Sequence, residues 1–516
     1  MCADDERYVK GIDRTQELVL PRTIDEYIDK ENPVRFIDGF VDTLDMNSIG
    51  FTHSETKDTG RPPYNPSDLL KLHIQGYSKR MRSSRVLEDA CKTNLDTIWL
   101  MKGLTPDFKT IADFRKDNVD RIRGVFKRFV SFLQEIDLVG GEVASLDGSK
   151  FKACNAKKRS FHKDNIELRL KRAEERIERY MKKLEKNDEL DDGEEEDADL
   201  VKKRNEYLRT KLEKLKKSRD ELKEIQKELK ESGKDEISLT DPDSRLMKNN
   251  GRIDVCYNAE FAVDKKEKLI VNYDVVNEAS DERQLFPMAK DTKEILGVEK
   301  LDMPVDTGFV NFLQIKECVE NGITPYFSSS SKLDGSDTGG GGVPDLVNFG
   351  KHKFVYDKKR DVYICPNHKE LIFGWTEKHA TKSGDAIRRV YSAGADVCNV
   401  CPFKTNCTNS KSKVGRRIHR YEAQDVVDEL LKKARNEPEK VDERVKLAEH
   451  PFATIKRAFN QGYFLLRGLR KVKGEMGLTV LAYDIKRALN IMGTSGLLCA
   501  LAMTTAPTGG SARPIK

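Results

Sequence analysis

Three acidic residues occupy positions from which their carboxylates could share metal ions. Val143-Ala-Ser-Leu-Asp-Gly predicts a short buried strand that ends at Asp147, where Gly148 turns the chain. Asp306-Thr-Gly follows a second predicted strand, and Glu449 lies on a predicted helix near the C-terminus. Carboxylates from separate elements could converge on Mg²⁺, which prefers oxygen ligands. Because the chain contains 87 Asp and Glu residues, this pattern alone is weak evidence for a metal site.

A second group of candidate ligands consists of four cysteines that lie close together in the sequence: Cys365, Cys398, Cys401 and Cys407. Four thiolates with one close pair could hold a structural zinc ion, and His368 is a substitute ligand. The alternative is a set of reduced, buried thiols without metal. In either case we expect the group to stabilise an insertion, since no acid or base is arranged there for zinc hydrolysis.

A basic segment follows Glu449 and contains no acid until Glu475. Its cationic residues are Lys456, Arg457, Arg467, Arg470, Lys471 and Lys473, and they interleave with Phe459, Tyr463 and Phe464. Such a surface could hold phosphates and stack bases. The alternative is an ordinary charged helix surface with its aromatic side chains in the core.

The elements that must position these residues alternate between strand and helix. β-rich runs at 252–263 and 269–276 predict a hairpin, and a helix (281–296), a strand (300–305), a helix (309–320) and a strand (324–327) follow. This order is typical of a layered α/β sheet. The region 351–420 favours strands, and 443–460 and 479–501 favour helices.

Other segments of the chain predict helices, a linker and a flexible region. Residues 64–138 show helical periodicity and many Lys and Arg, which predicts a small helical domain with a basic surface. Apolar spacings of four and three on both sides of the acidic stretch 188–199 predict an antiparallel helical hairpin, most simply a spacer or self-association arm. The serine and glycine runs between Ser328 and Pro344 predict a flexible linker.

Composition sets further bounds on the protein. A chain of 516 residues should contain more than one core. The net charge of +6 is the balance of 93 basic and 87 acidic residues, so local patches can be strong. The charged first residues show no secretory signal, and the longest apolar stretch, 491–503, is too short to span a bilayer. We therefore expect a soluble, intracellular protein.

Several motifs resemble those of prokaryotic insertion-sequence transposases with an RNase H-like DDE core, over most of the chain. The blocks that carry the resemblance of the core are Ser145-Leu-Asp-Gly-Ser-Lys-Phe-Lys-Ala, Val305-Asp-Thr-Gly-Phe and Ala448-Glu-His-Pro-Phe-Ala-Thr-Ile-Lys-Arg, with Asp241-Pro-Asp-Ser-Arg-Leu-Met and Cys256-Tyr-Asn-Ala-Glu-Phe-Ala-Val-Asp between the first two. Arg61-Pro-Pro-Tyr-Asn-Pro-Ser-Asp-Leu-Leu-Lys-Leu and Gly103-Leu-Thr-Pro-Asp-Phe-Lys-Thr-Ile-Ala-Asp-Phe-Arg resemble the helical N-terminal domain of that group.

The resemblance implies that Asp147, Asp306 and Glu449 are the ligands of two Mg²⁺ or Mn²⁺ ions. In related transposases the glutamate helix also carries a tyrosine and an arginine before the acid and a lysine seven positions after it. Lys456 matches the lysine, and Arg444 supplies the arginine one residue early. Neither residue 441 nor residue 442 is the expected tyrosine, which puts the helper roles in doubt but not the acids.

The resemblance also implies a reaction and its partners. Metal-dependent cleavage at the transposon ends is followed by attack of the freed 3′ hydroxyl on target DNA, both in-line displacements at phosphorus. The partners are double-stranded DNA and a second copy of the chain on that DNA, in a prokaryotic cytoplasm at the nucleoid. Trp375 could hold a flipped base, although core packing is the favoured reading. His450 is expected to cap or pack its helix rather than act as a base.

The fold class expected from these observations is α/β: an RNase H-like mixed sheet core with a helical N-terminal domain, an inserted helical hairpin and a cysteine-bearing β-rich insertion. The expected parts are a helical DNA-binding domain (1–138), the first part of the core (139–162 and 235–330), the hairpin (163–234), the linker and cysteine insertion (331–425), C-terminal core helices with Glu449 (426–502) and a flexible tail (503–516). Two rival functions remain: a nuclease of this fold that does not join strands, and a non-catalytic DNA-binding protein derived from a transposase.

Overall fold

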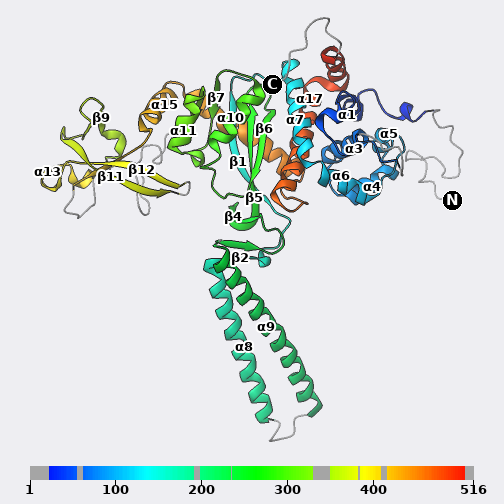
Figure 1. Ribbon diagram of the computed structural model, residues 1–516, viewed down its shortest axis with the longest axis horizontal. Helices are drawn as coiled ribbons and strands as arrows, with labels where there is room; N and C mark the ends of the chain where they lie inside the picture. Colours follow the sequence, from blue (N-terminus) through cyan, green and yellow to red (C-terminus); the bar gives the residue numbers. More distant parts are fainter. Residues whose placement is uncertain are drawn as a thin grey trace, which may run out of the picture. The chain divides into compact units, whose positions relative to one another are not determined.

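The computed structural model describes residues 23–54, 62–190, 198–233, 235–328, 349–381, 384–407 and 415–505 (Figure 1). Most of the expected linker at 328–344, the centre of the acidic stretch and the end of the expected tail lie outside these ranges. Within them the chain mixes helices with several sheets, as the α/β prediction requires. In the same ranges no helix combines the length and the apolar composition needed to cross a membrane.

The described residues divide into two compact units. The first unit contains residues up to 121 and from 485 onwards, and the second contains residues 122–484. Two long helices, α7 (Val119–Glu135) and α17 (Leu469–Thr505), continue from one unit into the other along the chain, and α17 is kinked at Gly493.

The first unit is helical. Its elements are η1 (Ile24–Tyr27), α1 (Pro33–Asp42), α2 (Met46–Ile49), α3 (Pro66–Ser78), α4 (Ser84–Thr93), α5 (Leu95–Leu100) and α6 (Phe108–Asp117). Local sequence sets where α1 and α3 begin: an asparagine N-cap, Asn32 or Asn65, accepts a backbone hydrogen bond and is followed by a proline at the first helical position. The helices then pack through apolar side chains such as Leu72, Leu87 and Ile111.

The second unit is built on a mixed sheet. β5 (Arg252–Asp264) pairs antiparallel with β1 (Ala144–Lys152) along one edge and with β6 (Ile270–Val276) and β4 (Arg245–Asn249) along the other. β7 (Leu301–Pro304) pairs parallel with β8 (Ile323–Tyr326). Two parallel bridges join this pair to β1: Val143, just before β1, pairs with Asp302, and Leu146 pairs with Val305, just after β7. The strands therefore follow the order β6, β5, β1, β7, β8.

Helices cover both faces of this sheet. On one face lies α16 (Pro438–Ala453), where the ring of Phe452 stacks on Phe261 of β5 with centroids 4.4 Å apart. Against the other face lies α10 (Leu285–Leu296), whose Thr292 hydroxyl accepts a hydrogen bond from Asn272 of β6. α11 (Phe312–Glu320) and α15 (Gln424–Asn436) complete this part of the unit.

Two insertions interrupt the sheet unit along the chain. The first is a pair of long helices, α8 (Lys163–Leu190) and α9 (Ala198–Ser232), with the short strands β2 (Ser160–His162) and β3 (Glu236–Ser238) at their base (Figure 1). The second is a five-stranded antiparallel sheet in the order β13, β12, β11, β10, β9, whose strands are β9 (Val355–Asp357), β10 (Val362–Ile364), β11 (Glu370–Thr381), β12 (Gly384–Ser392) and β13 (Arg417–Tyr421). Tyr363, Leu371 and Tyr391 form the centre of its core.

Candidate active site

Asp147 lies in the middle of β1, not at its end. The strand continues through Gly148 to Lys152, and Asp147 is paired with Phe261 of β5. The prediction that Gly148 turns the chain is therefore wrong, because a strand that pairs along its whole length with β5 does not need to end at its glycine. Paired residues point to the same face of a sheet, and Phe261 stacks on Phe452 of α16. The side chain of Asp147 therefore lies on the face of the sheet that α16 covers.

Asp306 lies beside Asp147 on the neighbouring strand. Val305 forms a parallel bridge with Leu146. Asp147 follows Leu146 and Asp306 follows Val305, so the bridge brings the two acids close together. The Ser145 hydroxyl donates to the carbonyl of Pro304 at 3.1 Å and ties the two strands together just before the acids. Asp306 then caps the 3-10 helix η3 (Thr307–Phe309). The sheet topology thus brings together two carboxylates that are 159 positions apart in the sequence.

Arg444 of α16 reaches both acids. Its Nη1 lies 3.8 Å from Oδ2 of Asp147 and 3.8 Å from Oδ1 of Asp306. Glu449 is on the same helix, one turn before Phe452, and its side chain is exposed. In the part of the chain that is described, no group of three or more His, Cys, Asp or Glu residues is arranged to hold a metal ion. The structure therefore gathers the two aspartates and Arg444, with Glu449 on the helix that carries Arg444.

The environment of Asp147 favours its neutral form. Burial is the main cause that raises its pKa to about 6, and the negative charges of Asp306 and Asp281 act in the same direction. The hydrogen bond from the Gly148 amide and the charge of Arg444 oppose this shift. A carboxylate held in such an environment gains more from a cation beside it than an exposed one does.

Lys456 points at the strand that carries Asp147. Its Nζ donates to Oγ of Ser149 at 2.5 Å and to the carbonyl of Lys150 at 2.9 Å, and it lies over the ring of Phe151. It belongs to a short π-helix, Thr454–Ala458, that follows α16. Burial lowers its pKa to about 8. Because the π-turn breaks the α-helical period, a spacing of seven residues does not by itself place Lys456 on the same face as Glu449.

The remaining basic residues of the segment after Glu449 differ in their surroundings. Arg457, Arg467 and Arg470 are exposed, and Lys471 is half-buried. Lys473 is bound to Asp274 at 2.7 Å. Phe459 and Phe464 lie in the core, and of the three aromatic residues in this segment only Tyr463 is exposed. The segment can therefore offer cations to phosphates, but two of its three aromatic rings cannot stack on a base.

A polar network lies on the face of the sheet opposite Asp147. Glu260 of β5 is fully buried, and Asn258 Nδ2 donates to it and to Oδ1 of Asp281. Lys150 Nζ also donates to Oδ1 of Asp281, at 2.9 Å. Burial, and then the charge of Asp281, raise the pKa of Glu260 well above its ordinary value.

This network was not predicted from the sequence, although a signal was present. Asn258 and Glu260 alternate on one face of a strand that is otherwise apolar between Cys256 and Val263. A buried strand face with polar side chains at alternate positions departs from the usual pattern, since unpaired buried polar groups are costly. Asp281, by contrast, precedes a helix and resembles an ordinary capping residue in the sequence.

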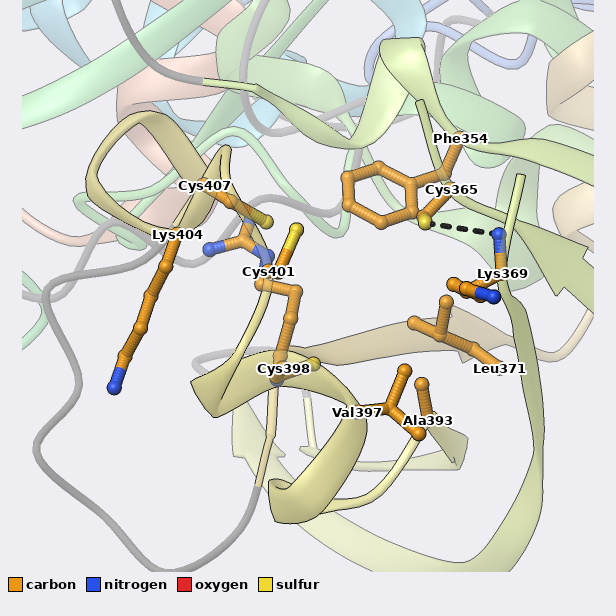
Figure 2. A pocket seen from close by; sticks show the side chains of 11 residues that line it. Phe354, Cys365, Lys369, Leu371, Ala393, Val397, Cys398, Cys401, Lys404 and Cys407 are labelled. Atoms are coloured by element: carbon orange, nitrogen blue, oxygen red, sulfur yellow. Dashed lines mark hydrogen bonds between the residues drawn. The ribbon is translucent and has the colours of Figure 1, made fainter. Parts of the chain in front are cut away.

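The four grouped cysteines line one cavity of about 30 Å³ in the second insertion (Figure 2). The backbone amide of Lys369 donates to Sγ of Cys365 at 3.3 Å and that of Arg416 to Sγ of Cys398 at 3.4 Å. Gly415 is required here, because a Cβ on it would lie 2.2 Å from a backbone oxygen and 2.7 Å from Sγ of Cys398. Four cysteine thiolates are a usual donor set for structural zinc, but in the described residues these four are not arranged to hold a metal ion. His368 is not among the described residues that line this cavity.

Trp375 and His450, the two remaining residues considered in the sequence analysis, lie in different surroundings. Trp375 on β11 is 39% exposed, lies under the guanidinium of Arg417 and donates to Glu377. The favoured prediction that it packs in a core is therefore wrong, because its strand presents this position to solvent. Nδ1 of His450 lies 3.0 Å from the hydroxyl of Tyr483, and the side chain of His450 is exposed.

Two family models match separate segments of the chain. A family model described as a transposase domain (DUF772) matches residues 22–117, and one described as a transposase DDE domain matches residues 364–489. The second match includes Glu449, Lys456 and the four cysteines, and Asp147 and Asp306 lie before it. Neither a curated protein nor a solved structure matches the chain. The two matches support an insertion-sequence transposase with an N-terminal transposase domain and a DDE domain.

Proposed function

We propose that this transposase cleaves DNA at the ends of its insertion sequence and transfers the strands into target DNA, using an RNase H-like core. The observation that carries the proposal is the pair Asp147 and Asp306, which follow bridged residues on adjacent strands and share Arg444. The strand order β6, β5, β1, β7, β8, with three antiparallel strands followed by two parallel ones, supports the RNase H-like assignment.

The chemistry of the carboxylate side chains suits two divalent cations. Asp147 and Asp306 would hold Mg²⁺ or Mn²⁺ together with Glu449, whose exposed side chain is free to turn on its helix. Bound there, the two ions would activate the attacking oxygen and stabilise the leaving one. Arg444 would balance the charge of the aspartates, and Lys456 would fix Ser149 and Lys150 in the strand that carries Asp147.

Double-stranded DNA is the partner that the transposase domains imply. We assign phosphate contacts to the exposed cations after the π-helix, namely Arg457, Arg467 and Arg470, with Lys471 beside them. Lys473, also a candidate, would have to exchange its bond to Asp274 for a phosphate. Two transposon ends must be brought together for transposition, so a homodimer on DNA is expected, at the nucleoid of a prokaryotic cell.

Cleavage of DNA that carries the element's own ends tests the proposal directly. We expect the parent protein to cut these ends with Mg²⁺ or Mn²⁺ and the Asp306→Asn variant to lose cutting while it keeps its melting temperature. A matched control is Asp302→Asn, which changes an acid on β7 that is bound to Lys440 instead. Equal cutting by parent and Asp306→Asn would refute the assignment of the site.

The same assay separates the rival functions. A protein that cuts the ends but does not join them to a target oligonucleotide is a nuclease of this fold. A protein that binds the ends tightly and never cuts them with either metal is a DNA-binding protein derived from a transposase. Joined products that depend on Asp306 establish the transposase reaction.

We also propose a structural zinc ion in the cavity of Cys365, Cys398, Cys401 and Cys407. The purified chain should then contain about one zinc per molecule by elemental analysis. Cys401→Ser should lower the zinc content and the melting temperature, whereas Cys499→Ser, which changes an exposed cysteine elsewhere, should change neither. Full-length protein without zinc, and with four titratable thiols in this cavity, would show that they are simply reduced cysteines.

A further inference from the structure

Glu260 fills a space that exists because residue 148 is a glycine. Gly148 is the register partner of Glu260 across the β1–β5 pair. A Cβ on residue 148 would lie 2.5 Å from Oε2 of Glu260 and 3.0 Å from its Cδ and Oε1. These distances are shorter than van der Waals contact, so no larger residue fits while Glu260 keeps its place. The carboxyl group is thus packed against β1 at the residue next to Asp147, on the opposite face of the sheet.

The other contacts of Glu260 link three elements. Asn258 Nδ2 donates both to Oε1 of Glu260 and to Oδ1 of Asp281, the latter at 2.6 Å. Lys150 of β1 donates to the same Oδ1. The chain of contacts therefore joins β5, the loop before α10 and β1. Glu260 Oε2 is buried and has no hydrogen-bond partner among the described residues.

The same network reaches the turn that carries Asp306. A Cβ on Gly308 would lie 3.3 Å from Oδ2 of Asp281 and 3.3 Å from Oδ2 of Asp306. Oxygens of Asp281 and Asp306 therefore both lie close to this glycine. One end of the network holds β1 next to Asp147, and the other end lies against the turn of Asp306.

Packing alone gives no reason to keep these groups. A buried carboxyl group with an unsatisfied oxygen costs free energy that an apolar residue in its place would not. Such groups persist where they position a functional site. Residues behind the direct ligands of a metal site orient those ligands, and their loss typically costs about 10-fold to 100-fold in metal affinity.

We propose that Glu260 and Asp281 are positioning residues of the carboxylate site: through Gly148 and Gly308 they fix the spacing between Asp147 and Asp306. This inference rests on the proposed function, because it assumes that the two aspartates bind divalent cations. It predicts that disturbing Glu260 changes metal affinity although Glu260 does not touch the metal.

The test measures Mn²⁺ binding to the full-length protein by titration calorimetry, alongside its melting temperature. Glu260→Ala should weaken Mn²⁺ binding about 10-fold or more, whereas Glu260→Gln, which keeps the shape and the hydrogen bond to Asn258, should stay within about threefold. Gly148→Ala should also weaken binding, because its new methyl group collides with Glu260. The double variant Gly148→Ala/Glu260→Ala removes the collision and should bind no worse than Glu260→Ala alone.

Val271→Ala serves as the control for general destabilisation. Val271 is a buried residue of β6, so this change should lower the melting temperature and leave the Mn²⁺ affinity as in the parent. Parent-like affinity in folded Glu260→Ala, or a double variant as weak as the sum of both single changes, would overturn the proposal. Should Glu260→Ala not fold, Gly148→Ala carries the test, and parent-like affinity in that variant overturns the proposal equally.

Failure of this inference can be told from failure of the proposed function. If Asp147→Asn and Asp306→Asn abolish Mn²⁺ binding but the Gly148 and Glu260 variants do not weaken it, only the positioning role is lost. If the two aspartate variants bind Mn²⁺ as the parent does, the site itself is misassigned.

Discussion

Two regions of the chain bury charged groups, and they differ in how closely these groups are paired with opposite charges. In the helical unit, Lys71 of α3 is fully buried, and its Nζ is bound by Asp38 and Asp42 of α1 at 2.6 Å each. Burial alone would lower the pKa of Lys71, but these hydrogen bonds raise it above its ordinary value. In the sheet unit, Arg444 approaches Asp147 only to 3.8 Å, and burial raises the pKa of Asp147.

The difference separates a structural charge from a functional one. A buried cation that is closely paired makes the fold depend on both partners, and it has little left to offer a ligand. Acids that are gathered without close cations leave a site that gains free energy when a cation binds. Substitutions in the two regions should therefore affect different measurements.

The largest expected effect is that of Asp147→Asn. The change should lower the rate of end cleavage by more than about a hundredfold, because it removes a direct ligand and so should exceed the effect of losing a supporting residue. The melting temperature should stay or rise, because the amide avoids the cost of a buried carboxylate. Cleavage assays and thermal melts on the same preparations check both parts, and a large drop in melting temperature would break the comparison.

Lys71→Met should show the opposite pattern. Removing the ammonium group leaves Asp38 and Asp42 without their partner, and we expect a loss of about 2–4 kcal/mol in the free energy of unfolding. The partial exposure of both aspartates places the loss below that of a fully buried pair. Urea unfolding measures the loss, and Mn²⁺ titration should give the affinity of the parent. A weakened Mn²⁺ affinity would show that Lys71 is not purely structural.

The sequence predicted that Asp147 and Asp306 could converge, but it missed the course of the strand that carries Asp147. Residue patterns placed Asp147 and Asp306 on separate strands and Glu449 on a helix, and the resemblance added Arg444 and Lys456. The sequence could not show that β1 continues past Asp147, because a glycine in a strand is also a common turn signal. In this chain the glycine serves a close approach by Glu260, a contact between residues 112 positions apart.

The parts missed by sequence reasoning depend on long-range packing. Phe464 is buried because the tertiary fold packs it against Phe151 and Tyr257. The sequence around Phe464 predicted a basic surface segment instead. The exposure of Trp375 likewise depends on which face of β11 meets solvent. By contrast, the helices α8 and α9 form where the local heptad-like spacing predicted helices, since that pattern is local.

A smaller effect concerns acid stability in the helical unit. His73 is fully buried, stacks on Phe114, and burial lowers its pKa to about 3. An unfolded histidine binds a proton near pH 6.5, so the unfolded chain takes up more protons between pH 6.5 and 3, and stability falls as the pH falls through this window. From pH 7 to pH 5 this loss should be about 2 kcal/mol.

The His73→Phe variant should not show this part of the loss of stability at acid pH. Urea unfolding of parent and variant at pH 7, 6 and 5 measures the difference in slope, and His53→Ala, an exposed histidine of the same unit, is the control. The same acid dependence in parent and His73→Phe would contradict a neutral buried imidazole.

The smallest effect should appear at alkaline pH and belongs to the sheet unit. Lys456 has its pKa lowered to about 8 by burial, below the value near 10.5 of an unfolded lysine. Between these values the unfolded chain holds a proton that the folded chain has lost, so stability rises with pH. From pH 7 to pH 9 the parent should gain about 1 kcal/mol relative to Lys456→Met. Lys446→Met, at an exposed position of α16, is the matched control. If parent and Lys456→Met gain equally, Lys456 carries its charge in the fold and can act on phosphates from its place beside Ser149.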